Sequence, residues 1–173
     1  MKRFSLLAAS ALALASFAAS GQAAGPTDPQ IAAIVVTANQ VDIDAGKLAE
    51  SKSQNKEVQA FARQMVTDHS GVNRSATALV TRLNVTPEEN ATSASLKSGG
   101  EANLKHLETL QGSAFDRAYI DNEVTYHQNV LDAIDHTLIP SAKNAELKAL
   151  LVKVRPAFEA HLAHAKQIQT ELS

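Results

Sequence analysis

The chain has 173 residues, carries a formal net charge of −2 and contains neither cysteine nor tryptophan. It therefore offers no basic field for nucleic acid and no disulfide bond as a source of stability. Aromatic residues make up only 4% of the chain, which argues against platforms that stack bases or sugars. Strand-like alternation of apolar and polar residues does not occur, so the sequence predicts an all-α protein.

Residues 1–24 have the features of a secretory signal peptide. A short positive start precedes an apolar run, and small residues follow that suit a signal peptidase. We expect cleavage after Ala23 or Ala24, which leaves residues 25–173 as one periplasmic domain. An uncleaved membrane anchor is the competing interpretation, but the apolar run is short for a span. With no cysteine for a lipid anchor, we expect neither a lipoprotein nor a transmembrane segment in the mature chain.

Helical periodicity and capping signals predict four long helices. We expect them at residues 29–53, 56–83, 114–138 and 144–171. Asp28 followed by Pro29 is typical of a helix start, and Ser113 resembles another capping residue. A crossover at 86–111, with one or two short helices, separates the second helix from the third. The sequence thus predicts a ferritin-like antiparallel four-helix bundle with a long crossover between helices two and three.

Each predicted helix has one ligand-type side chain on its apolar face, where positions 4, 7 and 11 apart coincide. These residues are Asp42, His69, His127 and His161. At 1.5 Å per residue from the turn centres, Asp42 and His69 differ in height by about 4.5 Å. His127 and His161 differ by about 9 Å, and Glu123, on the stripe of His127, matches His161 better. We therefore predict one polar layer at mid-bundle.

Three imidazoles with one or two carboxylates suit a single transition-metal ion such as Zn²⁺, Fe²⁺, Cu²⁺ or Mn²⁺. Only neutral imidazole is a ligand, so acid should weaken such a site. A hydrogen-bonded network of histidines and carboxylates would satisfy the same residues without an ion, and both interpretations stay open. An enzyme is the least favoured class, because the serines and threonines lie in no recognisable catalytic setting and a glycine-rich phosphate loop is absent.

Four motifs together are similar to a known family. They are Met65–His69, Ala114–Tyr119, His127 and Pro156–Leu162. They resemble the domain-of-unknown-function 4142 family, exported bacterial proteins with a ferritin-like bundle that are often labelled outer membrane proteins. The resemblance covers about residues 30 to 170, with matches at Asp68, His69, Phe115, Asp116, Tyr119, His127, Pro156 and His161. Where the family usually has glutamate in the first helix, this chain has the shorter Asp42.

The predicted function is therefore the binding of a metal ion or small ligand by His69, His127 and His161 with Asp42 or Glu123. We expect the remaining polar residues of the motifs to hold the histidines in position; they are Asp68, Asp116 and Tyr119. The two Glu-x-x-His motifs of di-iron bundles are absent, so a histidine-rich single-ion site is the expected form. The alternative is a non-catalytic envelope stress or interaction protein, with an envelope protein partner or a second copy of itself.

Overall fold

The computed structural model describes residues 25–173, and the predicted signal peptide lies outside the described residues. Every regular element in this part is helical, which confirms the all-α class. The five long helices are α1 (Asp28–Lys52), α2 (Lys56–Arg82), α3 (Ala91–Thr109), α4 (Gly112–Ala133) and α6 (Ala145–Glu171). A π-helical turn, η1 (Ile134–Leu138), and the short α5 (Ile139–Ser141) connect α4 to α6.

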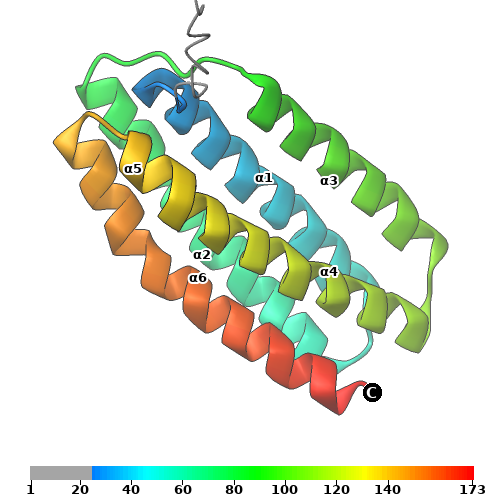
Figure 1. Ribbon diagram of the computed structural model, residues 1–173. Coiled ribbons are helices and arrows are strands. Elements are labelled where there is room, and N and C mark those ends of the chain that lie inside the picture. Colours follow the sequence, from blue (N-terminus) through cyan, green and yellow to red (C-terminus); the bar gives the residue numbers. More distant parts are fainter. Residues whose placement is uncertain (1–24) are drawn as a thin grey trace, which may run out of the picture.

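Four of the long helices enclose a common interior, and the fifth packs outside them (Figure 1). Helix α1 contacts α2, α2 contacts α6, α6 contacts α4, and α4 contacts α1. Helix α3 packs mainly on α1 and touches α4 only sparsely. The finer assignment to a ferritin-like bundle stays a prediction.

The start of α1 corrects one predicted helix cap. Thr27, not Asp28, is the N-cap: its hydroxyl accepts a hydrogen bond from the Gln30 N–H while the Gln30 side chain accepts from the Thr27 N–H. Asp28 instead forms hydrogen bonds with residues far away in the sequence. Its carboxylate accepts hydrogen bonds of 2.9 Å from the N–H groups of Lys143 and Asn144. The first turn of α1 is thereby tied to the turn before α6.

The predicted crossover holds one continuous 19-residue helix, α3, where we expected short helices. Asn90 caps it by accepting hydrogen bonds of 3.1 Å from the N–H groups of Thr92 and Ser93. Gly100 is where α3 approaches α1. A Cβ atom at Gly100 would lie 2.8 Å from the Val41 side chain, so only glycine fits without a shift.

The third predicted helix also differs at both ends. Helix α4 begins at Gly112, whose φ of 54° a residue with a side chain rarely adopts. Ser113 is therefore inside the helix, and the N-cap Gln111 makes no side-chain cap bond, so the predicted Ser113 cap was wrong. At the other end the α-helix gives way to the π-helical turn at Ile134 instead of continuing to Leu138.

A polar layer divides the core into two apolar clusters. One cluster includes Ala49, Met65, Ile120 and Ile168, and the other includes Ile31, Leu79, Ile134 and Leu151. On α1, α2, α4 and α6 alike, the predicted ligand residues lie between the positions that belong to the two clusters. Apolar packing therefore encloses the polar layer on both sides along the helix axes.

Along residues 25–173, no helix combines the length and the hydropathy that crossing a bilayer requires.

Candidate metal centre

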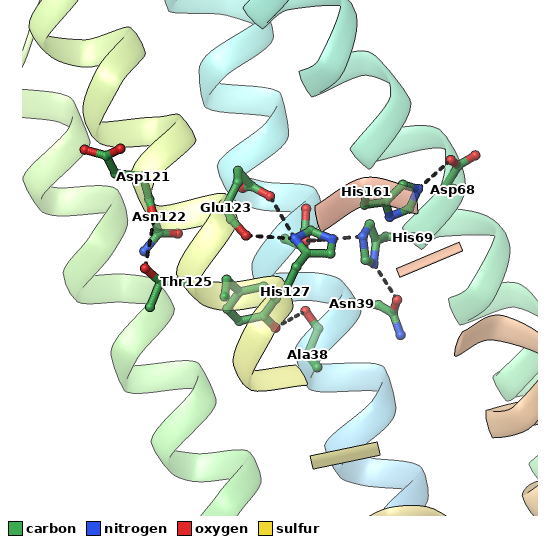
Figure 2. A network of polar contacts seen from close by, with 12 residues as sticks. Ala38, Asn39, Asp68, His69, Asp121, Asn122, Glu123, Thr125, His127 and His161 are labelled. Carbon is green, nitrogen blue, oxygen red and sulfur yellow. Dashed lines mark hydrogen bonds and ion pairs between the residues drawn. The ribbon is translucent and has the colours of Figure 1, made fainter. Parts of the chain in front are cut away.

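The three predicted histidines come together inside the ring of helices. His69 on α2, His127 on α4 and His161 on α6 each offer a ring nitrogen, and these atoms lie within 4.8 Å of one another. All three side chains are buried, as is Asp42, which reaches them from α1. Figure 2 shows the histidines meeting between the helices, with Glu123 on the side of His127 that faces away from His69. Four segments far apart in the sequence thus supply one cluster.

Asn39 fixes the tautomer of His69. The Asn39 Nδ2 atom donates to the Val35 carbonyl oxygen at 2.7 Å, which leaves its Oδ1 as an acceptor. Nδ1–H of His69 therefore donates to Asn39 Oδ1 at 2.7 Å. Because neutral imidazole has one N–H, the lone pair of His69 is on Nε2, which points away from Asn39.

His127 and His161 are oriented in the same way by pure acceptors. Nδ1–H of His127 donates to the backbone carbonyl oxygen of Glu123 at 3.0 Å. Nε2–H of His161 donates to the Asp68 carboxylate at 2.9 Å. The free lone pairs are therefore on Nε2 of His127 and Nδ1 of His161. Outer partners of this kind orient metal-binding histidines and raise their basicity.

Those three nitrogens have no hydrogen-bond partner in the described part of the protein, and neither carboxylate oxygen of Asp42 has one. Asp42 Oδ2 nevertheless lies 3.2 Å from Nε2 of His69 and 3.6 Å from Nε2 of His127. When Asp42 is ionised, lone pairs face one another across these gaps, so either a cation or a proton must lie between them. Tetrahedral bonds of about 2.0–2.1 Å place neighbouring ligand atoms about 3.3 Å apart. The residues present therefore fit a single bound cation.

Burial keeps the three imidazoles neutral, as metal ligands must be, but it also holds a proton on the carboxyl group of Asp42, which metal binding has to displace. Burial, followed by the nearby charges of the other two histidines, lowers the pKa of His69 to about 2. Burial likewise lowers the pKa of His127 to about 4 and lowers that of His161. The imidazoles thus stay neutral at ordinary pH. Burial raises the pKa of Asp42 to about 8, and burial with the Asp42 charge raises that of Glu123 well above its ordinary value.

Glu123 lies beside the cluster on the far face of His127. Its Oε2 atom is 3.4 Å from Nδ1 of His127, the nitrogen that already donates to the Glu123 carbonyl. Asp42, Glu123 and His127 offer a second set of ligand atoms within 4.8 Å of one another. The free lone pair of His127, however, is on Nε2, on the side of Asp42. Glu123 is therefore the less suitable of the two candidate carboxylate ligands.

The three predicted positioning residues have different surroundings. Asp68 contacts His161 directly, as expected. Tyr119 is buried, and its hydroxyl finds no hydrogen-bond partner within residues 25–173; burial and then the Glu123 and Asp42 charges raise its pKa. Asp116 is elsewhere: its carboxylate accepts a hydrogen bond of 2.5 Å from Ser53 Oγ and holds the turn between α1 and α2.

Sequence reasoning missed Asn39 and Phe158. Asn39 is three residues before Asp42, so helical spacing alone would have placed it on the same face. Phe158 is likewise three residues before His161. Its ring centroid lies 5.0 Å from that of His69 and 5.9 Å from that of His127, so it forms an apolar wall of the site.

The height mismatch predicted for His127 and His161 is removed by the connection between their helices. The difference of about 9 Å follows if the turn is centred near Ser141, but the residues outside helices are 142–144. Measured from Lys143, the two histidines differ in height by only two residues, about 3 Å.

A depression of about 440 Å³ connects the site to the surface between α2 and α6. Asp68, His69 and His161 are among its lining residues. The Asp68 side chain is 41% exposed, whereas that of His161 is 3% exposed. A cation from solvent would therefore meet the Asp68 carboxylate before the imidazoles.

Two comparisons with known proteins found matches. The family model described as "Domain of unknown function (DUF4142)" matches residues 13–168. A solved structure described as CopM in the Cu(II)-bound form aligns with a TM-score of 0.68 and 18% identity, covering 86% of this chain and 99% of that chain. At this identity the similarity shows the fold alone. None of the curated proteins matches the sequence.

Proposed function

The chain belongs to the DUF4142 family, and we propose that this member binds one transition-metal ion between its four central helices. The ligands are Nε2 of His69, Nε2 of His127, Nδ1 of His161 and a carboxylate oxygen of Asp42. In line with the predicted signal peptide, we place this site in the periplasm.

One observation supports the proposal above all others: four buried side chains direct unpartnered acceptor atoms at one another. Leaving a buried polar group without a partner costs about 1–3 kcal/mol. Several such atoms in one place would cost a large part of the stability of a typical protein, which is about 5–15 kcal/mol. A divalent cation satisfies all of them together.

The donor set narrows the choice of ion. Three imidazole nitrogens and one carboxylate oxygen suit Cu²⁺ and Zn²⁺, whereas Cu⁺ prefers the sulfur of cysteine or methionine. Copper is the first ion to test because it binds most N/O sites more tightly than other divalent first-row metals, and the CopM structure is described as Cu(II)-bound. Four protein donors are the number that a closed tetrahedral site uses, so these residues would hold an ion rather than keep a position open for substrate.

Metal titration with a matched pair of variants tests the proposal. Chelator-treated mature protein would be titrated with Cu²⁺ and with Zn²⁺ by calorimetry, beside His69→Gln and His136→Gln. His136 is an exposed histidine whose Nδ1 faces Asp132, so its loss removes an imidazole without touching the centre. We expect one ion per chain for wild type and His136→Gln and at least about 100-fold weaker binding for His69→Gln, since loss of an outer partner alone costs 10–100-fold.

The second candidate function is that of an envelope interaction protein with a purely structural polar network. The raised pKa of Asp42 favours it, because a protonated carboxyl could donate to Nε2 of His69 at 3.2 Å. Uptake of neither ion by wild type, together with lower stability of His69→Gln, would establish that alternative and reject the metal site.

A further inference from the structure

An apolar cavity of about 170 Å³ lies beside the candidate metal centre, at the level of η1. Ile34, Ile134, Leu138, Leu151 and Val154 are among its lining residues, and no lining residue is ionisable at ordinary pH. Phe158 and Asn39 also line it, so they separate the cavity from the histidines. A charged ligand would therefore be desolvated here without any compensating charge.

A surface groove of about 540 Å³ between α3 and α4 leads to this cavity. Thr92, Leu96, Tyr126 and Asn129 line both spaces. The rest of the groove is uncharged, and its lining combines apolar residues such as Val41 with hydroxyl and amide side chains that include Ser95, Asn103, Asn122 and Thr125. The two spaces thus form one path that is more polar at its mouth than at its inner end.

Two further features lie in the walls of this path. Gly99 lines the groove in the middle of α3, and a Cβ atom there would meet nothing within 4 Å. Packing therefore does not require glycine, which is less stable than alanine in a helix by roughly 0.5–1 kcal/mol. The π-helical turn η1 supplies Ile134 and Leu138 to the cavity wall. Single π turns within α-helices are frequent at functional sites.

We propose that groove and cavity together bind a small uncharged molecule with one apolar part and one polar end. The apolar part, about the size of one aromatic ring, fills the cavity, since an apolar cavity of about 150 Å³ stays dry and binds benzene. The hydroxyl or carbonyl end faces the amides and hydroxyls of the groove. This site shares no proposed ligand residue with the metal centre and does not depend on a bound ion.

Thermal unfolding of the mature protein with three ring-sized probes tests the ligand class. Benzene, benzyl alcohol and benzoate would be compared at equal millimolar concentration, with and without a chelator. Binding to the native state raises Tm, and a shift of at least about 2 °C corresponds to clear occupancy in a protein of this size. We expect shifts with benzene and benzyl alcohol and none with benzoate. Shifts with none of the probes, or with benzoate alone, would overturn the proposal.

Two tryptophan variants on α3 locate the site. Leu96→Trp places a large side chain where groove and cavity meet, and we expect it to abolish the Tm shift. Leu104→Trp is the matched control: this residue is also half-buried on α3 but packs against the other apolar cluster. It should keep the shift. Equal shifts in wild type and Leu96→Trp would place the probes elsewhere and reject the site.

A measurement on the unaltered protein covers the case in which Leu96→Trp does not fold. Crystals of the wild-type protein would be exposed to xenon under pressure. We expect one xenon peak in the cavity, next to Ile134 and Phe158. Absence of xenon from the cavity would show that it is not accessible and would reject the proposal, whatever the result of metal titration.

Discussion

Replacing Asp42 with asparagine should change metal-free stability and metal affinity in opposite directions. The pKa of Asp42 is raised from 3.8 to about 8 by burial. Because the folded state holds the proton more tightly than the unfolded state, this carboxyl lowers stability as pH rises from about 4 to about 8. At 1.36 kcal/mol per pKa unit, the full shift of about four units corresponds to at most about 6 kcal/mol.

Asparagine has the same shape and does not ionise, so Asp42→Asn removes this cost. In chelator-treated protein, we expect its advantage over wild type to be near zero at pH 4. The advantage should grow by up to about 1.4 kcal/mol per pH unit and level off above pH 8. The histidines are common to both proteins, so their titration cancels in the difference. Urea unfolding at pH 4, 6, 8 and 9 measures it.

Metal binding by the same variant should fall more than about 100-fold, because a charged ligand is lost where an outer partner alone costs 10–100-fold. Asp44→Asn is the control. Asp44 is on the same helix, half-buried, and accepts one hydrogen bond of 2.9 Å from Gln40. Its replacement should change stability by less than about 0.5 kcal/mol and leave metal affinity unchanged. Lower stability of Asp42→Asn at every pH, with metal affinity intact, would refute the role of Asp42 as a ligand.

Three further outcomes follow from the same structure. Asn39→Ala removes the acceptor for its histidine partner and should weaken metal binding by 10–100-fold in calorimetry, whereas Gln40→Ala, next to it in the chain, should not. Metal binding should release close to one proton at pH 6 and almost none at pH 9, because the buried carboxylate ligand has a pKa of about 8; calorimetry in buffers of different ionisation enthalpy measures this number. In urea unfolding, Gly99→Ala should stabilise by roughly 0.5–1 kcal/mol, and Gly100→Ala should destabilise by about 1–3 kcal/mol by its clash with Val41. Destabilisation by both glycine variants would contradict the described packing of α3.

The sequence also predicted that acid would weaken the site by protonating imidazole. The structure assigns the competing proton to a different group. His69 and His127 have pKa values lowered to about 2 and about 4, whereas Asp42 is still protonated at neutral pH in the metal-free protein. Acid should weaken metal binding whether the proton goes to an imidazole or to Asp42. Because Asp42 takes it up, we expect metal affinity to begin to fall as the pH drops below about 8. The two predictions differ because the pKa values depend on how deeply each group is buried, and a helical wheel does not show this depth.

Helical periodicity alone determined the all-α class and which residues face inward. It placed Asp42, His69, His127 and His161 on the apolar faces of four different helices, and all four are buried together. This succeeded because the 3.6-residue repeat is a property of each segment by itself, and an apolar stripe must be buried whatever its neighbours are.

Only the tertiary structure decided how these residues meet. The true position of the 142–144 turn brought His127 and His161 to one level, and Asn39 and Asp68 selected the ring nitrogens that are left free. Asp116 belongs to the same motif as Tyr119, but its carboxylate accepts a hydrogen bond from Ser53 at the α1–α2 turn instead of contacting a histidine. Heights and hydrogen-bond partners depend on turn geometry and on the mutual packing of distant helices, and no single stretch of sequence specifies these.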